Sequence, residues 1–273
     1  MKKVAFSIDV EPDIRTGSYK GVYEGLPRLE KLLDKYNIKP TLFVTCDCIE
    51  KYPSIFKRLM KKGWEISLHG YRHTRFDVLT SEEKKDNLKK AIACFKKYLG
   101  ILPSGFRAPQ HSLDEDTTAN ALKAFKINYD SSLNPWNFYH LLFFWKIKVN
   151  QRYNFTKSSI HYRNGLMEIP ISSCIMPFSS ITLRIFPKSI LRPFFFFISL
   201  KKNPVFFMHS WDLIKIKDSK LYNLCPLEDF LGRLEFLLEY LSNNCKFYTI
   251  DEIYHQFKLE SKTLSHLTHM GVL

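Results

Sequence analysis

The sequence predicts an α/β fold built around a parallel β-sheet, and three observations lead to this prediction. Short apolar runs that suit buried strands alternate with amphipathic segments that suit helices. Repeated strand, helix, strand units form parallel sheets with right-handed crossovers. The chain has 273 residues, enough to bury a large core, and contains neither an internal repeat nor a glycine- or serine-rich linker. We therefore expect one domain.

Strands and helices alternate regularly in the first half of the chain. Residues 25–38 place leucines on one face, which predicts a helix. A later helix opens with a capping box from Thr80 to Glu83 and ends at Gly100. The predicted strands of this half are 4–10, 40–45, 64–69, 104–109 and 127–132, and the predicted helices are 25–38, 52–63, 80–100 and one between the last two strands.

The second half is less regular. Residues 135–203 are aromatic, basic and interrupted by prolines, and only one strand, 166–172, is predicted there. The alternation returns with a strand at 204–210, a helix at 227–241, a strand at 246–250 and a helix at 251–257. We predict a single domain over residues 1–258, with an irregular insertion at 135–203 and a poorly ordered tail at 259–273.

The composition and the first residues indicate which partners and which cellular compartment to expect. The formal net charge of +14 favours anionic partners, or is simply a solvated basic surface. Six scattered cysteines suggest neither a disulfide framework nor a zinc knuckle. The start, MKKVAFSIDVEP, meets Asp9 and Glu11 before an apolar region forms, so no signal peptide is predicted and a cytoplasmic setting is expected.

Polar residues follow several predicted strands, where parallel sheets place their active sites. Asp9 and Glu11 are two residues apart on a strand and face the same side, while His69 and His73 are four apart, a spacing that suits a metal. Two carboxylates beside such a pair suit a metal hydrolase, in which one carboxylate binds the ion and the other acts as a base. Taken singly, solvated acids and a chance histidine pair are the better explanations.

Three further residues lie at strand ends. Arg107 is placed to pair with Asp9, or is an ordinary surface arginine. His209 ends the buried strand VFFMH and is placed to donate a proton, with the neighbouring Asp212 setting its tautomer, or is a histidine at the edge of the core. Asp130 also follows a strand.

Five short segments together resemble one family. They are SIDVE, HGYRH, FRAP, YDSS and FMHSWDL, and in this order and spacing they resemble the five motif regions of the polysaccharide deacetylases, carbohydrate esterase family four. The resemblance covers about Val4 to Ile253. It implies a distorted (β/α) barrel of about seven strands and a metal-dependent hydrolysis of an N-acyl group from an amino sugar.

The resemblance also implies roles for matching residues. Asp9 matches the catalytic base, Arg107 the arginine that supports this base, and His209 the general acid. After the proline of the FRAP motif, Gln110 stands where the family usually has an aromatic residue, and its backbone N–H would help to hold the oxyanion. Trp211 and Leu213 would wall a pocket for the acyl methyl, or are ordinary core residues.

The metal ligands follow the family with one departure. His69 and His73 match two ligands, and the commonest first motif supplies a third from an aspartate where this chain has Val10. The chain instead resembles the subgroup with an acid two residues after the base, so Glu11 is the expected third ligand. The resemblance implies a divalent ion, with Zn²⁺ as the expected one. Without Glu11 in reach, the site would resemble metal-independent relatives that hydrolyse cyclic ureides.

Substrate and location are inferred less directly. A cytoplasmic member of the family is expected to act on a glycan precursor, an N-acylated amino sugar on a lipid or nucleotide carrier. Residues 181–202 mix phenylalanines with cations and prolines, so they are expected to lie on the inner face of a membrane without crossing it, or to pack as a lid or core cluster. A non-catalytic glycan binder is the remaining alternative, and no nucleic-acid motif is present.

Overall fold

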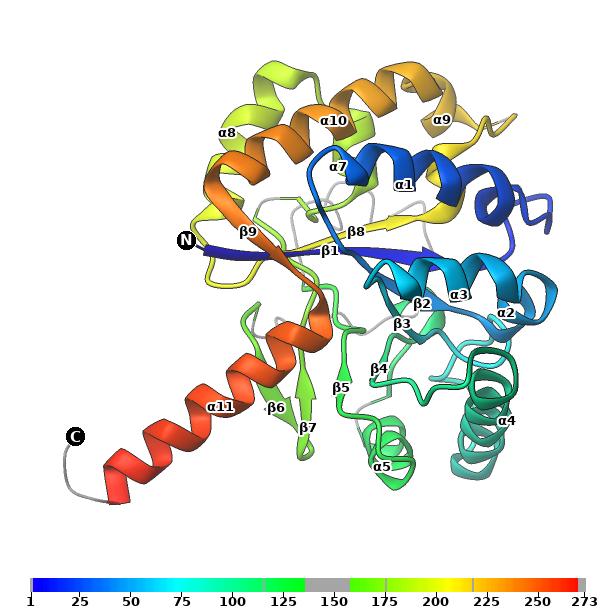
Figure 1. Cartoon of the computed structure of the whole chain (residues 1–273), viewed down its shortest axis with the longest axis vertical. Coiled ribbons are helices and arrows are strands. Elements are labelled where there is room, and N and C mark those ends of the chain that lie inside the picture. Colours follow the sequence, from blue (N-terminus) through cyan, green and yellow to red (C-terminus); the bar gives the residue numbers. More distant parts are fainter. Residues whose placement is uncertain (1, 115, 136–157, 175, 218, 270–273) are drawn as a thin grey trace.

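The computed structural model describes residues 2–114, 116–135, 158–174, 176–217 and 219–269. Within these ranges a curved sheet forms the centre of the molecule and helices lie on its outside (Figure 1). The strands are β1 (Lys2–Val10), β2 (Thr41–Val44), β3 (Glu65–Leu68), β4 (Gly105–Phe106), β5 (Tyr129–Asp130), β6 (His161–Arg163), β7 (Leu166–Glu168), β8 (Val205–His209) and β9 (Cys245–Tyr248).

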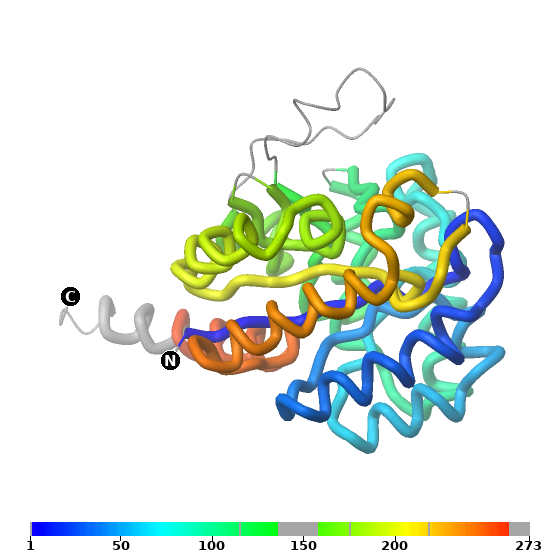
Figure 2. The backbone as a smooth tube through the Cα atoms, turned by 90° about the horizontal axis from the view of Figure 1, so that it is seen from above, coloured from blue at the N-terminus to red at the C-terminus, as the bar shows by residue number. Residues whose placement is uncertain are grey.

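The described strands join in the order β6-β7-β5-β4-β3-β2-β1-β8, and β9 pairs with the first half of β1. Each pairing is parallel except that of β6 with β7, which confirms the predicted α/β fold. Nine strands stand in place of about seven, because β6 adds a short antiparallel partner to β7 and β9 adds to β1. Figure 2 shows β8 (yellow) beside β1 (blue).

The sheet forms an incomplete barrel. No described strand joins β7 to β8, and residues 171–174 and 176–179 lie along β8 instead. Ser172 N–H donates to the carbonyl of Val205 at 3.1 Å, and Phe207 N–H donates to the carbonyl of Phe178 at 3.0 Å. These bonds satisfy backbone groups at the β8 edge that would otherwise lack partners. The opening of the barrel is therefore bridged by these residues.

The helices cover the outer face of the sheet. They are α1 (Leu26–Asp34), α2 (Cys46–Lys51), α3 (Pro53–Lys61), α4 (Ser81–Leu99), α5 (Thr117–Ala124), α7 (Ser180–Ile185), α8 (Lys188–Ser199), α9 (Lys220–Leu224), α10 (Leu227–Asn244) and α11 (Ile250–His269). The capping box predicted for α4 is present, and Gly100 ends this helix with a φ of 75°. Within the described ranges, no helix is both long and apolar enough to span a bilayer.

The alternation of side chains along β1 separates core from site. Phe6, Ile8 and Val10 are fully buried in the larger hydrophobic cluster beneath the helices. Ala5 belongs to a second cluster, and Ser7 and Asp9 follow it at intervals of two. Successive side chains on a strand face opposite sides, so these odd-numbered residues face the inside of the curved sheet. The polar end of this inner face is at the carboxyl end of β1.

The region expected to be irregular contains two helices. Residues 136–157 of the expected insertion lie outside the described residues, but α7 and α8 follow in 180–199, where we predicted none. Pro193 lies inside α8. A proline within a helix removes one backbone hydrogen bond, so in a sequence it predicts the end of a helix. The helix forms because Leu191, Phe195 and Ile198 are buried on one face.

The expected tail begins as a helix. We predicted poor order from residue 259, but α11 continues to His269, and residues 270–273 lie outside the described part. The segment has no proline or glycine before Gly271, so nothing in its backbone stops the helix. Glu260 also accepts from Lys202 at 3.0 Å and lies 3.4 Å from Lys3, which ties this turn of the helix to the body.

Candidate active site

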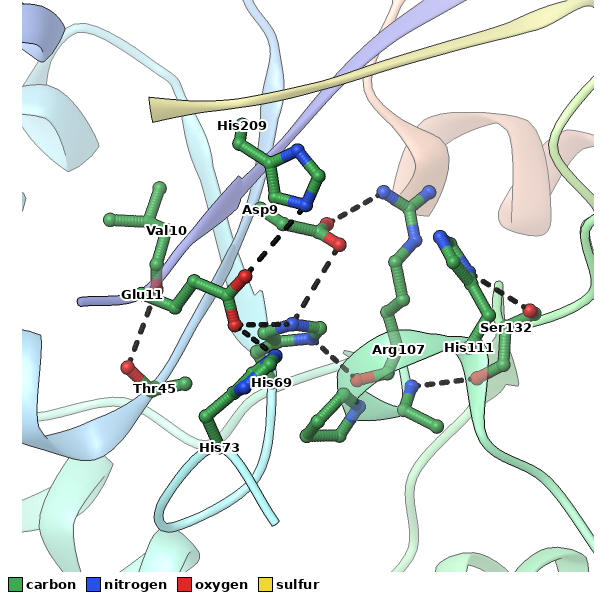
Figure 3. Close-up of polar contacts among 12 residues, drawn as sticks. Asp9, Val10, Glu11, Thr45, His69, His73, Arg107, His111, Ser132 and His209 are labelled. Carbon is green, nitrogen blue, oxygen red and sulfur yellow. Dashed lines mark hydrogen bonds and ion pairs between the residues drawn. The ribbon is translucent and has the colours of Figure 1, made fainter. Parts of the chain in front are cut away.

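Polar side chains from four strand ends meet at the carboxyl end of the sheet (Figure 3). Asp9 is opposite His209 in the register of β1 with β8, and Glu11 follows β1 directly. His69 follows β3 and Arg107 follows β4, which are neighbouring strands. The parallel order therefore brings together residues that are up to 200 positions apart, as expected from their places in the sequence.

Asp9 and Arg107 form a buried ion pair. Arg107 Nη1 donates to Oδ1 of Asp9 at 2.8 Å, and both side chains are almost completely buried. Burial alone would raise the pKa of Asp9, but the charges of Arg107 and of nearby histidines outweigh it and lower the pKa. Asp9 is therefore ionised near neutral pH, as a base must be.

Arg107 is held by two residues that the sequence reading did not single out. Its Nη2 donates to the hydroxyls of Ser7 and Ser131, each at 3.0 Å, and its Nε donates to the carbonyl of Ser131 at 2.9 Å. The guanidinium also lies over the Phe43 ring, 4.1 Å from its centroid. Ser131 is in the YDSS segment and Ser7 begins the SIDVE segment, so these two motifs carried the available signal.

Glu11, His69 and His73 form a group whose ligand atoms all lie within 4.8 Å of one another. Glu11 Oε2 lies 3.5 Å from Nε2 of His69 and in close contact with Nε2 of His73. Burial alone would raise the pKa of Glu11, but the two histidines outweigh it and lower the pKa. The departure at Val10 thus leaves three ligand atoms together, with the acid supplied by Glu11.

The hydrogen bonds of His69 fit a metal ligand. Its Nδ1 lies 2.8 Å from the carbonyl of Arg107. A carbonyl only accepts, so Nδ1 carries the proton and Nε2 presents a lone pair toward Glu11 and Asp9. Nε2 of His69 and Oε2 of Glu11 are both buried without a hydrogen-bond partner among the described residues. Buried polar atoms without partners are costly, and a cation between them would remove that cost.

His209 stands opposite this group. Its Nε2 lies 3.7 Å from Oε1 of Glu11, and its ring stacks on Trp211 with centroids 4.2 Å apart and planes 11° apart. The ring is a quarter exposed, so it faces the open side of the site. Trp211 is nearly buried and fixes the plane of the imidazole. The arrangement suits a histidine that exchanges a proton with a bound molecule.

Asp212 acts on His209 differently from the sequence expectation. Its Oδ2 is 4.0 Å from Nδ1 of His209, too far for a hydrogen bond, and accepts instead from the backbone N–H of His209 at 2.9 Å. The other oxygen accepts from Tyr222 Oη at 2.9 Å and from Arg184 Nε at 3.4 Å. Asp212 therefore holds the backbone of the turn, and as a buried carboxylate with these partners it is not placed to bind substrate.

Arg184 was expected among the cations of a membrane-facing segment. The structure buries its side chain to 1% exposure, between the rings of Tyr222 and Phe230 and against Asp212. Its Nη1 and Nη2 donate to the carbonyls of Cys225 and Asp212, each at 2.8 Å. This residue supports the turn after β8, and it is not available to a membrane.

One of the remaining predicted residues, Leu213, is placed differently from expectation. Leu213 is fully buried in the larger hydrophobic cluster, and a pocket wall must be accessible when the pocket is empty, so it belongs to the core. Gln110 is exposed and has a left-handed φ of 56°. The residue after it, His111, was not predicted and points into the site beside Arg107 (Figure 3). Nothing in one sequence marks this turn.

Comparison with known proteins finds similar sequences for the first half of the chain. The family model described as polysaccharide deacetylase matches residues 2–129. A peptidoglycan deacetylase from Helicobacter pylori is 34% identical over 126 residues, which cover 46% of this chain and 42% of that protein. A peptidoglycan-N-acetylglucosamine deacetylase from Bacillus cereus is 26% identical over 114 residues, 42% of this chain and 38% of that protein. The chain thus spans less than half the length of these curated relatives.

The fold has relatives over nearly its whole length. The crystal structure of a protein from Mycobacterium smegmatis, assigned to the polysaccharide deacetylases, superposes with a TM-score of 0.69. The match covers 95% of this chain and 91% of that one at 17% sequence identity. At such identity the likeness concerns the fold alone. The half of the chain beyond residue 129, which contains His209, therefore shares its fold with that structure.

Proposed function

Because the polysaccharide deacetylase family model matches residues 2–129, we propose that this chain is a hydrolase that removes an N-acyl group, acetyl or formyl, from an amino sugar. One observation carries the proposal. Asp9 is ionised and fixed by Arg107, while its free oxygen, Oδ2, lies 3.7 Å from the Nε2 of His69 that presents a lone pair. A base beside a group of side chains that can bind a metal is what metal-assisted hydrolysis of an amide requires.

The side chains divide the reaction between them. Asp9 takes the proton of the attacking water, and Arg107 keeps this carboxylate ionised and oriented. His209 gives a proton to the departing amine, held in plane by Trp211. The backbone N–H of Gln110 is our candidate for stabilising the oxyanion. The amide N–C bond breaks to give a carboxylic acid and a free amine.

Glu11, His69 and His73 would hold a divalent cation, with Zn²⁺ as the first candidate because one carboxylate and two imidazoles suit it. When bound, the ion supplies a Lewis acid that polarises the acyl carbonyl and lowers the pKa of a water. The proton on Nδ1 of His69 supports this assignment, since the carbonyl of Arg107 fixes the tautomer that leaves Nε2 as the ligand.

The experiment is a deacylation assay on a panel of amino sugars. N-acetyl and N-formyl forms are offered as free sugars, oligomers, UDP conjugates and polyprenyl-linked sugars, and free amine is measured. We expect Asp9→Asn to reduce kcat by at least about 100-fold. Asp116→Asn, a change of the same kind at an exposed aspartate, is the control and should keep full activity. Unchanged turnover by Asp9→Asn would remove the base assignment.

Two other functions remain distinguishable. A metal-independent hydrolase of cyclic amides on the same scaffold would release no amine from the sugars, would open a cyclic ureide, and would keep activity after chelation. A non-catalytic glycan binder would bind the oligomers with neither activity. The orphaned polar atoms of His69 and Glu11 favour the metal-dependent enzyme over both.

We favour a carrier-linked sugar as substrate, together with peripheral contact with an anionic membrane. The support is the exposed side of α8, where Phe196, Phe197 and Leu200 are each about half exposed beside the exposed cation Arg192. These residues are near the start of β8, whereas the site is at its end (Figure 1). Such a contact would hold the protein on the membrane surface while the active site stays outside the lipid.

Sedimentation with vesicles tests the membrane contact. Phe196→Ser with Phe197→Ser removes the exposed aromatics and spares the buried Phe195, whose loss would damage the core. We expect the double variant to lose binding to vesicles that contain phosphatidylglycerol. Val78→Ser with Leu102→Ser changes two equally apolar, exposed side chains elsewhere and should bind as the unmodified chain does. Equal binding by all three proteins would remove this proposal.

A further inference from the structure

The turn after Arg107 has an unusual backbone. Gln110 and His111 both have left-handed φ angles, 56° and 53°, which residues other than glycine seldom adopt, and here two occur in succession. The surroundings hold this conformation: His111 N–H donates to the carbonyl of Ala108 at 2.9 Å, and Ser112 N–H donates to that of Pro109 at 3.1 Å. Strained backbone that is fixed in this way is concentrated at functional sites.

The strained turn directs His111 into the site. Gln110 is exposed, whereas His111 is half-buried with its ring edge-on to Phe207, the centroids 5.0 Å apart. Phe207 in turn packs against His209, with centroids 4.9 Å apart. Figure 3 shows His111 beside Arg107, on the other side of that arginine from the metal-binding group. The ring therefore borders the space in which a substrate would be held.

The hydrogen bond of His111 settles which of its ring nitrogens is free. Nδ1 lies 3.1 Å from the carbonyl of Ser132, and because a carbonyl only accepts, Nδ1 carries the proton. Nε2 then presents a lone pair, and it has no hydrogen-bond partner among the residues that the structure describes. Burial lowers the pKa of His111 to about 4, more than the opposing effect of Asp9 raises it, so the ring is neutral near pH 7.

We propose that His111 is a substrate-binding residue whose Nε2 accepts a hydrogen bond from a hydroxyl or amide N–H of the acylated sugar. The inference rests on the proposed function, because it takes an N-acylated amino sugar as the molecule bound. It gives His111 a role that His209 does not have. His209 donates a proton during the reaction. His111 accepts a hydrogen bond from the substrate and so fixes the position of the sugar relative to Asp9.

Nitrogen NMR tests the protonation state directly. In protein labelled with ¹⁵N-histidine, the His111 signals are assigned by their loss in His111→Phe. We expect a neutral ring protonated at Nδ1, and a shift of the Nε2 signal when UDP-N-acetylglucosamine or tetra-N-acetylchitotetraose binds to the inactive Asp9→Asn protein. A ring protonated at Nε2, or an Nε2 signal unmoved at saturation, would overturn the inference.

Binding measured by calorimetry in the Asp9→Asn background gives the second test. His111→Phe keeps a ring and removes the acceptor, and should weaken binding about 10-fold. His111→Gln places a carbonyl oxygen near the position of Nε2 and should retain most of the affinity. His255→Phe, the same change on the exposed side of α11, is the control.

The two proposals fail differently in this experiment. Equal affinity of His111→Phe and its parent overturns the role of His111 and leaves the proposed function standing. Absence of binding by any N-acylated sugar to the parent counts against the proposed function, and the role of His111 falls with it. Circular dichroism confirms that the His111→Phe protein is folded, and the His111→Gln protein repeats the comparison with a polar side chain of similar reach.

Discussion

Arg107 and Asp9 are joined by a hydrogen bond of 2.8 Å between Nη1 and Oδ1, and at most 3% of either side chain is exposed. The three other hydrogen bonds of Arg107 go to Ser7 and Ser131. Four of the five N–H groups of this buried cation thus donate to a named acceptor. The pair both fixes the proposed base and joins β1, β4 and β5 inside the barrel.

Replacing Arg107 with methionine should damage stability as well as activity. The change leaves Asp9 buried without its cation, and loss of one partner of a buried pair typically costs about 3–5 kcal/mol. We expect a fall of that size in the free energy of unfolding, measured with urea. Lys90→Met removes a cation from an exposed pair with Asp86 and should leave the free energy of unfolding almost unchanged. A cost for Arg107→Met as small as this control would contradict the interpretation.

The ion pair of Lys84 with Asp114 predicts a pH dependence of stability. Lys84 on α4 has 1% of its side chain exposed and contacts Asp114, which precedes α5. Burial alone would raise the pKa of Asp114, but hydrogen bonds from Lys84, Thr117 and Thr118 outweigh it and lower the pKa to about 2. The pair therefore links two helices through a carboxylate that is partly open to water.

Asp114→Asn should destabilise the protein by about 1–3 kcal/mol near neutral pH, a range reduced for the exposure of Asp114. The folded pKa lies below the unfolded one, so this stabilisation is present above about pH 4 and is lost as the pH falls toward about 2. Urea unfolding of both proteins at several pH values should therefore give curves that converge in acid. Asp86→Asn, in an exposed pair, is the control and should show no such convergence.

Metal binding gives a prediction that does not depend on finding the substrate. If Glu11 is a ligand, Zn²⁺ should raise the unfolding temperature of the chain, and a chelator should reverse the increase. Glu11→Gln should weaken the affinity measured by calorimetry at least about 100-fold, because an amide is a poorer zinc ligand than a carboxylate. Glu82→Gln, at an exposed glutamate, should bind as the unmodified chain does. Equal affinity of both variants would remove Glu11 from the ligand set.

The sequence predicts four of the strands well because each of these has a local signal, whereas β6 was not predicted. β1, β2, β3 and β8 are apolar runs with clear limits, and their parallel order follows from the alternation with helices. The order of strand ends then places Asp9, His69, Arg107 and His209 at one edge of the sheet. The helix α8 has no such clear signal, since Pro193 interrupts it and its amphipathic pattern is hidden in a run of phenylalanines.

Contacts between distant residues account for what the sequence does not predict. Arg184 looks like a surface cation among phenylalanines, yet it pairs with Asp212, 28 residues further on, at the end of a different element. His111 likewise becomes part of the site through two left-handed residues for which the sequence has no glycine as a signal. Burial and partners of this kind follow from the tertiary packing, which overrides the local pattern.

β4 and β5 pack tightly against each other where Gly105 is opposite Tyr129. A Cβ added at Gly105 on β4 would lie 2.0 Å from Cζ of Tyr129 on β5, and this tyrosine is fully buried. Its hydroxyl bonds to the half-buried Glu65, so the ring has a fixed place in the second hydrophobic cluster. Gly105→Ala must therefore displace either the ring or the strand, and overpacking of this kind typically costs about 1–3 kcal/mol.

The same substitution at Gly232 is the matched control. This glycine lies inside α10, and an added Cβ would have nothing within 4 Å. Alanine is favoured over glycine in a helix interior by about 0.5–1 kcal/mol, so Gly232→Ala should stabilise the protein. Urea unfolding should move the two midpoints in opposite directions. If Gly105→Ala also stabilised the protein, the tight contact of β4 with Tyr129 would be wrong. The position of Ser131, which follows Tyr129 by two residues and accepts a hydrogen bond from Arg107, would then also be in question.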